Sequence, residues 1–196
     1  MTGDPRPFEP TARKDRRRLT HVDRRGRPRM VDVSAKPPTP RRAIAEAKVL
    51  MAQETLSLII DGAGPKGDVM SVAELAGVMG AKRTSDLIPL CHPIALTDLG
   101  VEITPDRVEG WLRIRTTAAT VGPTGVEMEA LTAAAIAALT VYDMIKGIDR
   151  SAEIVSVRLL EKSGGKTGEW RRPADDAPQG PRPRVPKGSR GPRRSG

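Results

Sequence analysis

The sequence feature that most constrains the fold is the stretch from Thr124 to Gly147. Thr124-Gly125-Val126-Glu127 has the spacing of a capping box, and the residues that follow are Ala-rich and apolar on almost every side of a helical projection. Gly147 supplies a stop directly after Lys146. A helix that is apolar nearly all round has to be buried, so the rest of the chain must provide a layer that covers it.

Alternating segments predict that this layer is an antiparallel sheet. Residues 99–104 and 107–120 alternate between apolar and polar positions and are joined through Pro105-Asp106, which predicts a hairpin. Residues 154–160 predict a further strand. Residues 19–36 are expected to form an extended arm that alternates at 30–34 and ends at a proline cluster.

Two shorter helices are expected in the first half of the chain. One runs to about Ile60 with Thr39 as N-cap and Pro40 as its first residue. The other runs from Ser71 as N-cap to about Ala81. Their inward faces are expected to hold Ile44, Ala47, Met51, Thr55 and Leu58 in the first helix, and Val72, Leu75, Val78 and Met79 in the second. The order of elements predicts an α+β fold with the helices on one side of the sheet.

Polar residues at both ends of the long helix are candidate functional groups. Glu129, Thr132, Thr140 and Asp143 lie on one side of the helix, interrupted by Ile136. Glu129 and Asp143 are about 21 Å apart at 1.5 Å per residue, so one small ligand would not reach both within one chain. A site that uses both requires a second subunit. Burial and the helix C-terminus are expected to raise the pKa of Asp143, and Lys146 one turn away is expected to lower it.

The segment from Lys82 to Pro93 holds the single cysteine and one of the two histidines. Pro89 and Pro93 bracket Leu90, Cys91 and His92 and bias this backbone toward extended conformations. The segment indicates either an imidazole presented on a stiff backbone or a proline-bounded turn with a buried cysteine. A single cysteine and two histidines do not make a zinc site, and no metal is expected.

Two glycine-rich loops resemble phosphate-binding motifs without the required context. Residues 62–67 match G-x-G-x-x-G, but a predicted helix rather than a strand precedes them. Residues 163–168 match half of a Walker A motif, whose first glycine would fall at Leu160. Lysines on these loops, Lys66, Lys162 and Lys166, remain candidates for contacts with an anion. This inventory suits acid–base chemistry on a polyphosphorylated substrate without a redox cofactor.

The net charge of +9 belongs to the two ends of the chain. Residues 1–29 carry ten Lys and Arg against four Asp and Glu, residues 171–196 carry eight against two, and residues 30–170 carry 15 against 18. Basic, Pro/Gly-rich tails over 1–18 and 171–196 are expected to be disordered, with nonspecific polyanion contact as their one partner interaction. A single cysteine, no signal peptide and no expected membrane span predict a cytoplasmic protein.

Six motifs, in order, resemble the MoaC family of cyclic pyranopterin monophosphate synthases of molybdenum cofactor biosynthesis. They are Met30-Val31-Asp32-Val33-Ser34, Lys66-Gly67-Asp68-Val69, the segment from Lys82-Arg83-Thr84 and Asp86 to Pro93, Gly125-Val126-Glu127-Met128-Glu129-Ala130-Leu131, Tyr142-Asp143-Met144 and Lys162-Ser163-Gly164-Gly165-Lys166. The resemblance covers residues 19–170 as one synthase domain. It implies a ferredoxin-like fold and a homohexamer, a trimer of dimers with inter-subunit sites.

The resemblance also implies a reaction and its residues. The reaction converts 3′,8-cyclo-7,8-dihydroguanosine 5′-triphosphate into cyclic pyranopterin monophosphate and releases pyrophosphate, with no cofactor expected. Asp143 and Lys146 are implied as catalytic residues. The implied substrate-binding residues are Leu90, Cys91, His92, Met128, Glu129, Lys66, Lys162 and Arg41. Many members have Gly-Lys-Thr-Gly where this chain has Gly122-Pro123-Thr124-Gly125. A non-catalytic scaffold on the same fold and a small RNA-binding module remain as alternatives.

Overall fold

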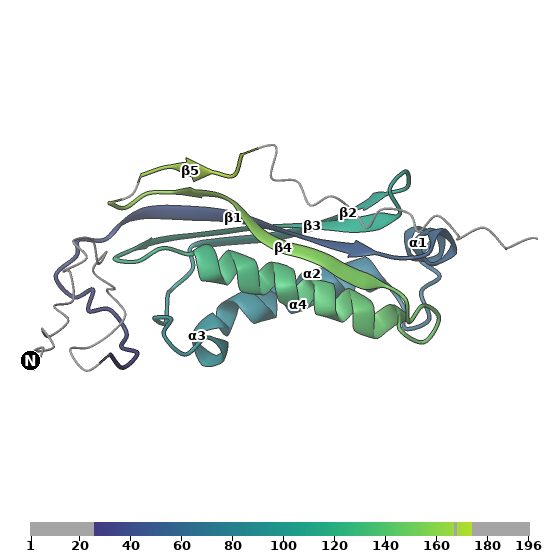
Figure 1. Ribbon diagram of the computed structural model, residues 1–196, viewed down its shortest axis with the longest axis horizontal. Helices are drawn as coiled ribbons and strands as arrows, with labels where there is room; N and C mark the ends of the chain where they lie inside the picture. The colour runs from purple at the N-terminus through teal and green to yellow at the C-terminus, as the bar shows by residue number, and fades with distance from the viewer. Residues whose placement is uncertain (1–25, 167, 174–196) are drawn as a thin grey trace, which may run out of the picture.

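The computed structural model describes residues 26–166 and 168–173, and within them an antiparallel sheet of order β2-β3-β1-β4-β5 (Figure 1). Its strands are β1 Thr39–Leu50, β2 Asp98–Asp106, β3 Trp111–Gly122, β4 Glu153–Ser163 and β5 Trp170–Arg171. The helices are α1 Gln53–Ile60, α2 Val69–Lys82, α3 Thr84–Leu87 and α4 Glu127–Ile145.

The connectivity is that of a ferredoxin-like fold. β1 pairs antiparallel with both β3 and β4, and β2 pairs antiparallel with β3. The chain therefore passes from β1 through helices to β2 with β3 between them, and from β3 through α4 to β4 with β1 between them, which is a split β-α-β unit used twice. Figure 1 shows α2 and α4 side by side under one face of the sheet. The predicted α+β class, with helices on one face, is confirmed.

The core lies between this face of the sheet and α4. Small side chains of β1 (Ala43, Ala45 and Ala47) and larger ones of β3 (Leu112 and Ile114) are buried against α4. α4 is the one helix among the described residues with the length and apolarity of a membrane span, and 56% of its 18-residue window is buried inside the protein. Its place under the sheet accounts for its apolar sequence.

The predicted helix over 40–60 is wrong for its first half, which forms the central strand β1. Alanine, glutamate and lysine between 43 and 48 favour a helix when each residue is considered alone. In the protein this segment pairs with a strand on each side, and both of its faces are covered. On the outer face Glu46 is ion-paired with Arg158 at 2.9 Å, and the Lys48 ammonium lies 3.9 Å from the centre of the Trp111 ring. Only α1 remains helical.

α2 is found where it was predicted, but its cap and its inward face differ from the prediction. The N-cap is Asp68, which accepts a hydrogen bond from the Ser71 N–H at 3.1 Å. Of the residues expected inside, Val72, Leu75 and Met79 are exposed. The buried residues of α2 are Val69, Ala73, Gly77, Gly80 and Ala81. The reason is close packing, because a Cβ on Gly80 would overlap Ile136 of α4.

The remaining elements follow the sequence with local corrections. The hairpin, the long helix and the last long strand are confirmed as β2–β3, α4 and β4. The capping box is wrong, because the N-cap of α4 is Val126 and no side chain caps the helix. The expected alternation at 30–34 is present in the burial of the side chains, because Val31 and Val33 are half-buried between exposed neighbours, but these residues form no strand and an Asp32–Ser34 turn follows. β5 was not predicted, and residues 1–18 and 174–196, which belong to the two expected tails, lie outside the described part of the chain.

Candidate active site

A cavity of ≈ 570 Å³ lies at the N-terminal end of α4 and gathers most of the sequence-predicted site residues. The segment after Pro89 supplies Leu90, Cys91 and His92, and the first turn of α4 supplies Met128 and Glu129. The remaining lining residues are Val31, Val33, Lys36, Ile94, Thr124, Gly125, Glu127 and Lys162. Segments about 60 and 100 residues apart in sequence therefore share one wall.

Glu129 is the most buried ionisable group in this cavity. Its residue is 3% exposed, and its Oε2 atom has no hydrogen-bond partner within the described part of the chain. Burial raises the pKa of the Glu129 carboxyl, and the nearby Glu127 charge adds to the rise. Burial also raises the pKa of the Cys91 thiol, with Glu129 adding to the effect, so Cys91 remains a thiol rather than a thiolate at neutral pH.

Cationic side chains line both this cavity and a neighbouring one. Lys36, Thr124, Gly125, Glu127 and Lys162 line both. The second cavity adds Arg41, Pro123 and Lys166. Lys162 is ion-paired with Glu127 at 3.0 Å. Two anionic or polar groups of one ligand could therefore be held by cations from the arm before β1, from β1 itself and from the end of β4.

Arg41 is held beside the departure from the family motif at Pro123. Its Nε donates to the Gly122 carbonyl and its Nη2 to the Pro123 carbonyl, each at 3.3 Å. Gly165 has a positive φ of 70°, and a Cβ there would overlap the Arg41 guanidinium. The Gly164-Gly165 pair thus allows close approach of the β4 end to β1, which is a physical reason for glycine other than phosphate binding.

The other sequence-predicted residues form a second cluster at the C-terminal end of α4. The Asp143 carboxylate accepts from Lys146 Nζ at 2.6 Å through Oδ1 and from Lys66 Nζ at 2.8 Å through Oδ2. Lys66 Nζ also donates to the Asp143 carbonyl at 3.0 Å. Lys66 reaches α4 from the glycine-rich loop between α1 and α2. This loop therefore brings a lysine to the Asp143 carboxylate and does not serve as a dinucleotide-binding motif.

The expected burial of Asp143 is wrong. Its side chain is 54% exposed, and those of its two lysine partners are also about half exposed. Hydrogen bonds from Lys146 and Lys66, with their charges, lower the pKa of Asp143 to about 2. The same contact raises the pKa of Lys146. In the single protomer the group is therefore a permanent carboxylate between two ammonium groups, and it does not titrate near neutral pH.

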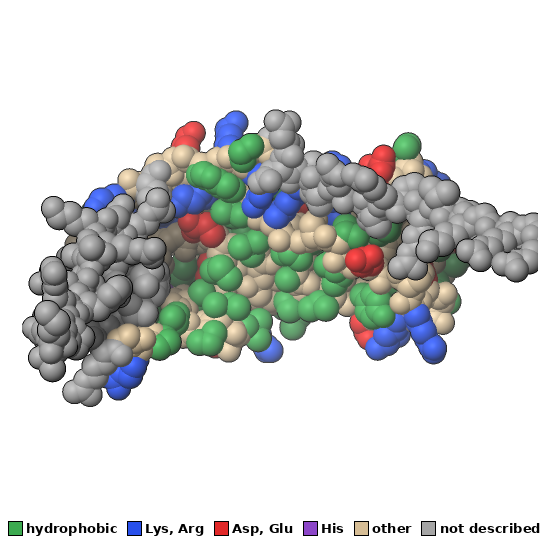
Figure 2. Space-filling view, in the orientation of Figure 1, with side chains coloured by type: hydrophobic (Ala, Val, Ile, Leu, Met, Phe, Trp, Pro, Cys, Tyr) green, Lys and Arg blue, Asp and Glu red, His purple; other side chains and the backbone are tan. Residues whose placement is uncertain are grey.

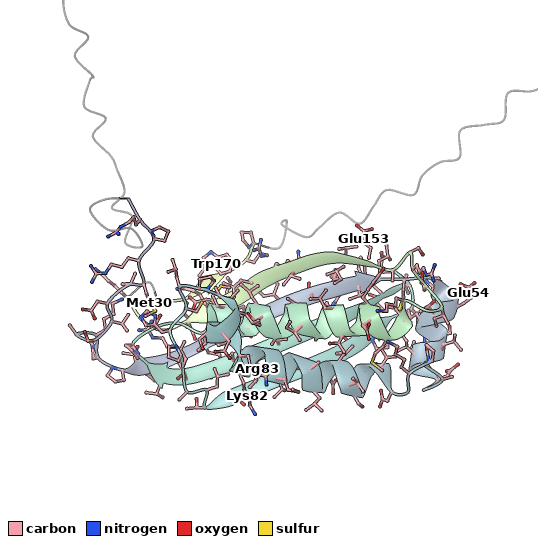
Figure 3. All side chains as sticks on the ribbon, turned by 90° about the horizontal axis from the view of Figure 1, so that it is seen from below. Met30, Glu54, Lys82, Arg83, Glu153 and Trp170 are labelled. Atoms are coloured by element: carbon pink, nitrogen blue, oxygen red, sulfur yellow. The ribbon has the colours of Figure 1, made fainter. Side chains whose placement is uncertain are left out.

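The two clusters lie at opposite ends of α4 and of the molecule. Figure 3 labels Met30, in the arm, and Glu54, in α1, at the two ends of the long axis. The Leu90–His92 segment and Glu129 lie at the same end of the molecule as Met30. Asp143 lies at the other end, near α1. Lys82 and Arg83, at the end of α2, are exposed and line neither cavity (Figure 3).

Sequence reasoning missed several lining residues. Lys36 and Glu127 contribute charge, and Val31 and Val33 contribute an apolar wall. Lys36 directly precedes two prolines, which marks the end of the arm but says nothing about where the arm lies. The link between the arm and the Pro-bounded segment is a hydrogen bond of 2.8 Å between His92 Nε2 and the Val31 carbonyl. No local pattern connects residues 61 positions apart.

We expect Glu129→Gln to stabilise the protein at neutral and alkaline pH. A carboxyl whose pKa is raised in the folded state contributes fully to stability below its unfolded pKa, and loses that contribution as pH rises through the folded pKa. A neutral amide avoids this loss, so the gain appears as pH rises and disappears in acid. Urea unfolding across this pH range measures the effect. Glu153→Gln, at an exposed position at the start of β4, is the control and should bring no such gain. A gain that persists in acid would contradict the prediction.

Together, a ferredoxin-like α+β scaffold, a cavity lined by cations and a Lys-Asp-Lys cluster make an arrangement that could bind an anionic small molecule. Among the described residues no group of three or more His, Cys, Asp or Glu could hold a metal ion. Comparison with known families places the chain more narrowly. Residues 30–165 match the MoaC family, and the chain belongs to that family.

Curated relatives agree with this assignment. The chain is 58% identical over 153 residues to proteins of Brucella ovis and Brucella abortus, each named cyclic pyranopterin monophosphate synthase. A protein of Brucella canis with the same name is 57% identical over the same length. These matches cover 78% of this chain and 93% of each relative. The predicted family is confirmed.

Proposed function

We propose that this protein converts 3′,8-cyclo-7,8-dihydroguanosine 5′-triphosphate into cyclic pyranopterin monophosphate and releases pyrophosphate. Family membership supports a role in molybdenum cofactor biosynthesis, and the names of the Brucella relatives support this synthase activity. The observation that carries the proposal is the cavity at the start of α4, which is lined by residues of four of the six motifs, those containing Val31, His92, Glu129 and Lys162.

The cations that line the two neighbouring cavities could bind the triphosphate of the substrate. Lys162 and Arg41 would neutralise phosphate oxygens, and their protein partners, Glu127 and two carbonyls, hold them in place. Arg41 lies against Pro123, so its guanidinium would supply the charge that a lysine brings there in many members. Leu90, Cys91, His92, Met128 and Glu129 would hold the purine-derived rings, with the buried Glu129 accepting from ring N–H groups.

The Lys-Asp-Lys cluster suits proton transfer. Asp143 would remain ionised and orient the two ammonium groups, and Lys146 would donate a proton as the purine ring opens and the pterin closes. Lys66 would be shared between Asp143 and the phosphate chain. The acid–base role assigned to Asp143 thus becomes that of a fixed anion with Lys146 as the proton carrier.

Both clusters would serve one reaction in a homohexamer, a trimer of dimers with sites shared between subunits. The separation of about 21 Å between Glu129 and Asp143 along α4 supports this assembly, because one substrate cannot span it. Exposed apolar residues also support association: Val72, Leu75, Met79 and Leu139 are each more than 40% exposed. Figure 2 shows hydrophobic side chains spread over the exposed side of α4 and β4. We place the enzyme in the cytoplasm.

We expect deletion of residues 1–18 and 173–196 to leave turnover and assembly unchanged. The family match begins at residue 30 and ends at residue 165, and the residues of both clusters lie inside it. Nonspecific binding to polyanions should fall, because the excess positive charge is removed. Turnover, gel filtration and a heparin column with a salt gradient measure these three properties. A truncated protein that folds and assembles but loses most of its turnover would show that a tail contributes to catalysis.

Genetic complementation tests the proposed function. A bacterial strain that lacks its own cyclic pyranopterin monophosphate synthase should regain molybdoenzyme activity when it expresses this protein. The Asp143→Asn variant, expressed at the same level, should not restore it. Failure of the wild-type protein, present and assembled in the cells, would contradict the proposal.

A further inference from the structure

The arm before β1 forms one wall of the cavity without being part of the sheet. Residues 30–36 have no helix or strand, and Figure 3 shows Met30 at this end of the molecule. Their local structure is a turn: Ser34 N–H donates to Asp32 Oδ1 at 2.9 Å, and Lys36 N–H donates to the Val33 carbonyl at 3.0 Å. Pro37 and Pro38 then restrict the backbone before β1 begins. This turn, residues 31–36, is called the strap below.

One hydrogen bond ties the strap to another part of the described chain, and it comes from the His92 ring. His92 Nε2 lies 2.8 Å from the Val31 carbonyl oxygen. A carbonyl oxygen only accepts, so Nε2 carries the proton and donates. His92 itself is on the Pro-bounded segment, so this bond joins the strap to that segment within one wall of the cavity.

The strap brings a charge as well as a wall. Val31 and Val33 line the cavity beside Leu90, and Lys36 lines both this cavity and the neighbouring one. Lys36 is therefore the strap's cation at the junction of the two. Its position depends on the strap, because the strap has no sheet pairing to fix it.

We propose that His92 is a positioning residue, whose ring holds the strap in place and so puts the Lys36 ammonium where a phosphate group of the ligand binds. The identity of the ligand in this proposal rests on the proposed function. The positioning of the strap by His92 does not depend on it. This role, exerted through the strap, is separate from the contact with the purine-derived rings that the proposed function gives to the same segment, and inorganic triphosphate has no such rings.

Two substitutions at His92 separate these roles by geometry. A glutamine amide reaches to the place of Nε2 and can still donate to the Val31 carbonyl, whereas an asparagine amide reaches only to the place of Nδ1. We expect His92→Gln to keep the strap and His92→Asn to release it. Hydrogen–deuterium exchange of the free protein measures this, with peptides that cover residues 31–36. In His92→Asn the amides of Ser34 and Lys36 should exchange about tenfold faster, and those of α4 should not change.

Binding of inorganic triphosphate, measured by calorimetry, tests the link to Lys36. His92→Asn and Lys36→Ala should each weaken binding about tenfold. The double variant should be no weaker than Lys36→Ala alone, because both changes remove the same contact. Unchanged exchange in His92→Asn, equal exchange in the Gln and Asn variants, or additive losses in the double variant would overturn the proposal. These measurements need no turnover, so they fail independently of the proposed reaction.

Discussion

Asp143→Asn should lower turnover by about a thousandfold or more while the protein still folds, assembles and binds substrate. The exchange is nearly isosteric, but it replaces a carboxylate that accepts from two ammonium groups at 2.6 and 2.8 Å. An amide can accept from one lysine only and turns its NH₂ toward the other. Both lysines then lose their alignment, and proton transfer by a positioned side chain contributes about 10²–10⁴ in rate.

The measurement is single-turnover conversion of the cyclic triphosphate nucleotide together with its binding constant. Asp98→Asn, an exposed carboxylate at the start of β2, is the matched control and should remain active. Lys66→Ala should weaken binding as well as rate, because this lysine is shared between Asp143 and the phosphates. Near wild-type turnover of Asp143→Asn would remove the role assigned to the cluster.

Mixing two inactive proteins should restore activity. Glu129→Ala removes the carboxyl proposed to hold the purine-derived rings. Asp143→Ala removes the carboxylate of the Lys-Asp-Lys cluster proposed for proton transfer. If each site takes these residues from different subunits, a mixed dimer contains one intact site and one doubly damaged site. Random mixing of equal amounts should recover about a quarter of the wild-type activity, since half of the dimers are mixed.

The experiment co-refolds the two variants and follows activity against the mixing ratio. Glu129→Gln, which keeps the volume of the buried side chain, replaces Glu129→Ala if the latter fails to fold. A mixture that stays as inactive as either parent, although mass spectrometry shows mixed dimers, would contradict a shared site.

The elements with strong local signals could be predicted from the sequence. The alternating hairpin and the Ala-rich helix have clear periods, and they became β2–β3 and α4. β1 could not, because Ala43 to Lys48 favours a helix locally and becomes a strand only through pairing on both sides. The face of α2 was misassigned for a related reason. Apolar size suggested Val72, Leu75 and Met79 as inward, whereas close packing on α4 selected the glycines and alanines.

The site shows the same division between local and tertiary information. The composition of the motifs indicated the charged residues, and the structure brings Leu90 to His92, Met128, Glu129, Lys162 and Arg41 to two adjoining cavities. The exposure of Asp143 could not be predicted, because it depends on how far the sheet and α2 cover the C-terminal turn of α4. The contact between His92 and Val31 is equally tertiary. Helical spacing did indicate that Glu129 and Asp143 are too far apart for one substrate.

The most direct test of the proposed synthase activity is the conversion catalysed by the purified wild-type protein. The assembled protein is incubated with 3′,8-cyclo-7,8-dihydroguanosine 5′-triphosphate, and both products are measured. We expect cyclic pyranopterin monophosphate and pyrophosphate in equal amounts, formed by the wild-type protein and not by Asp143→Asn. An assembled protein that binds the triphosphate but forms neither product, or that releases pyrophosphate without the pterin, would contradict it.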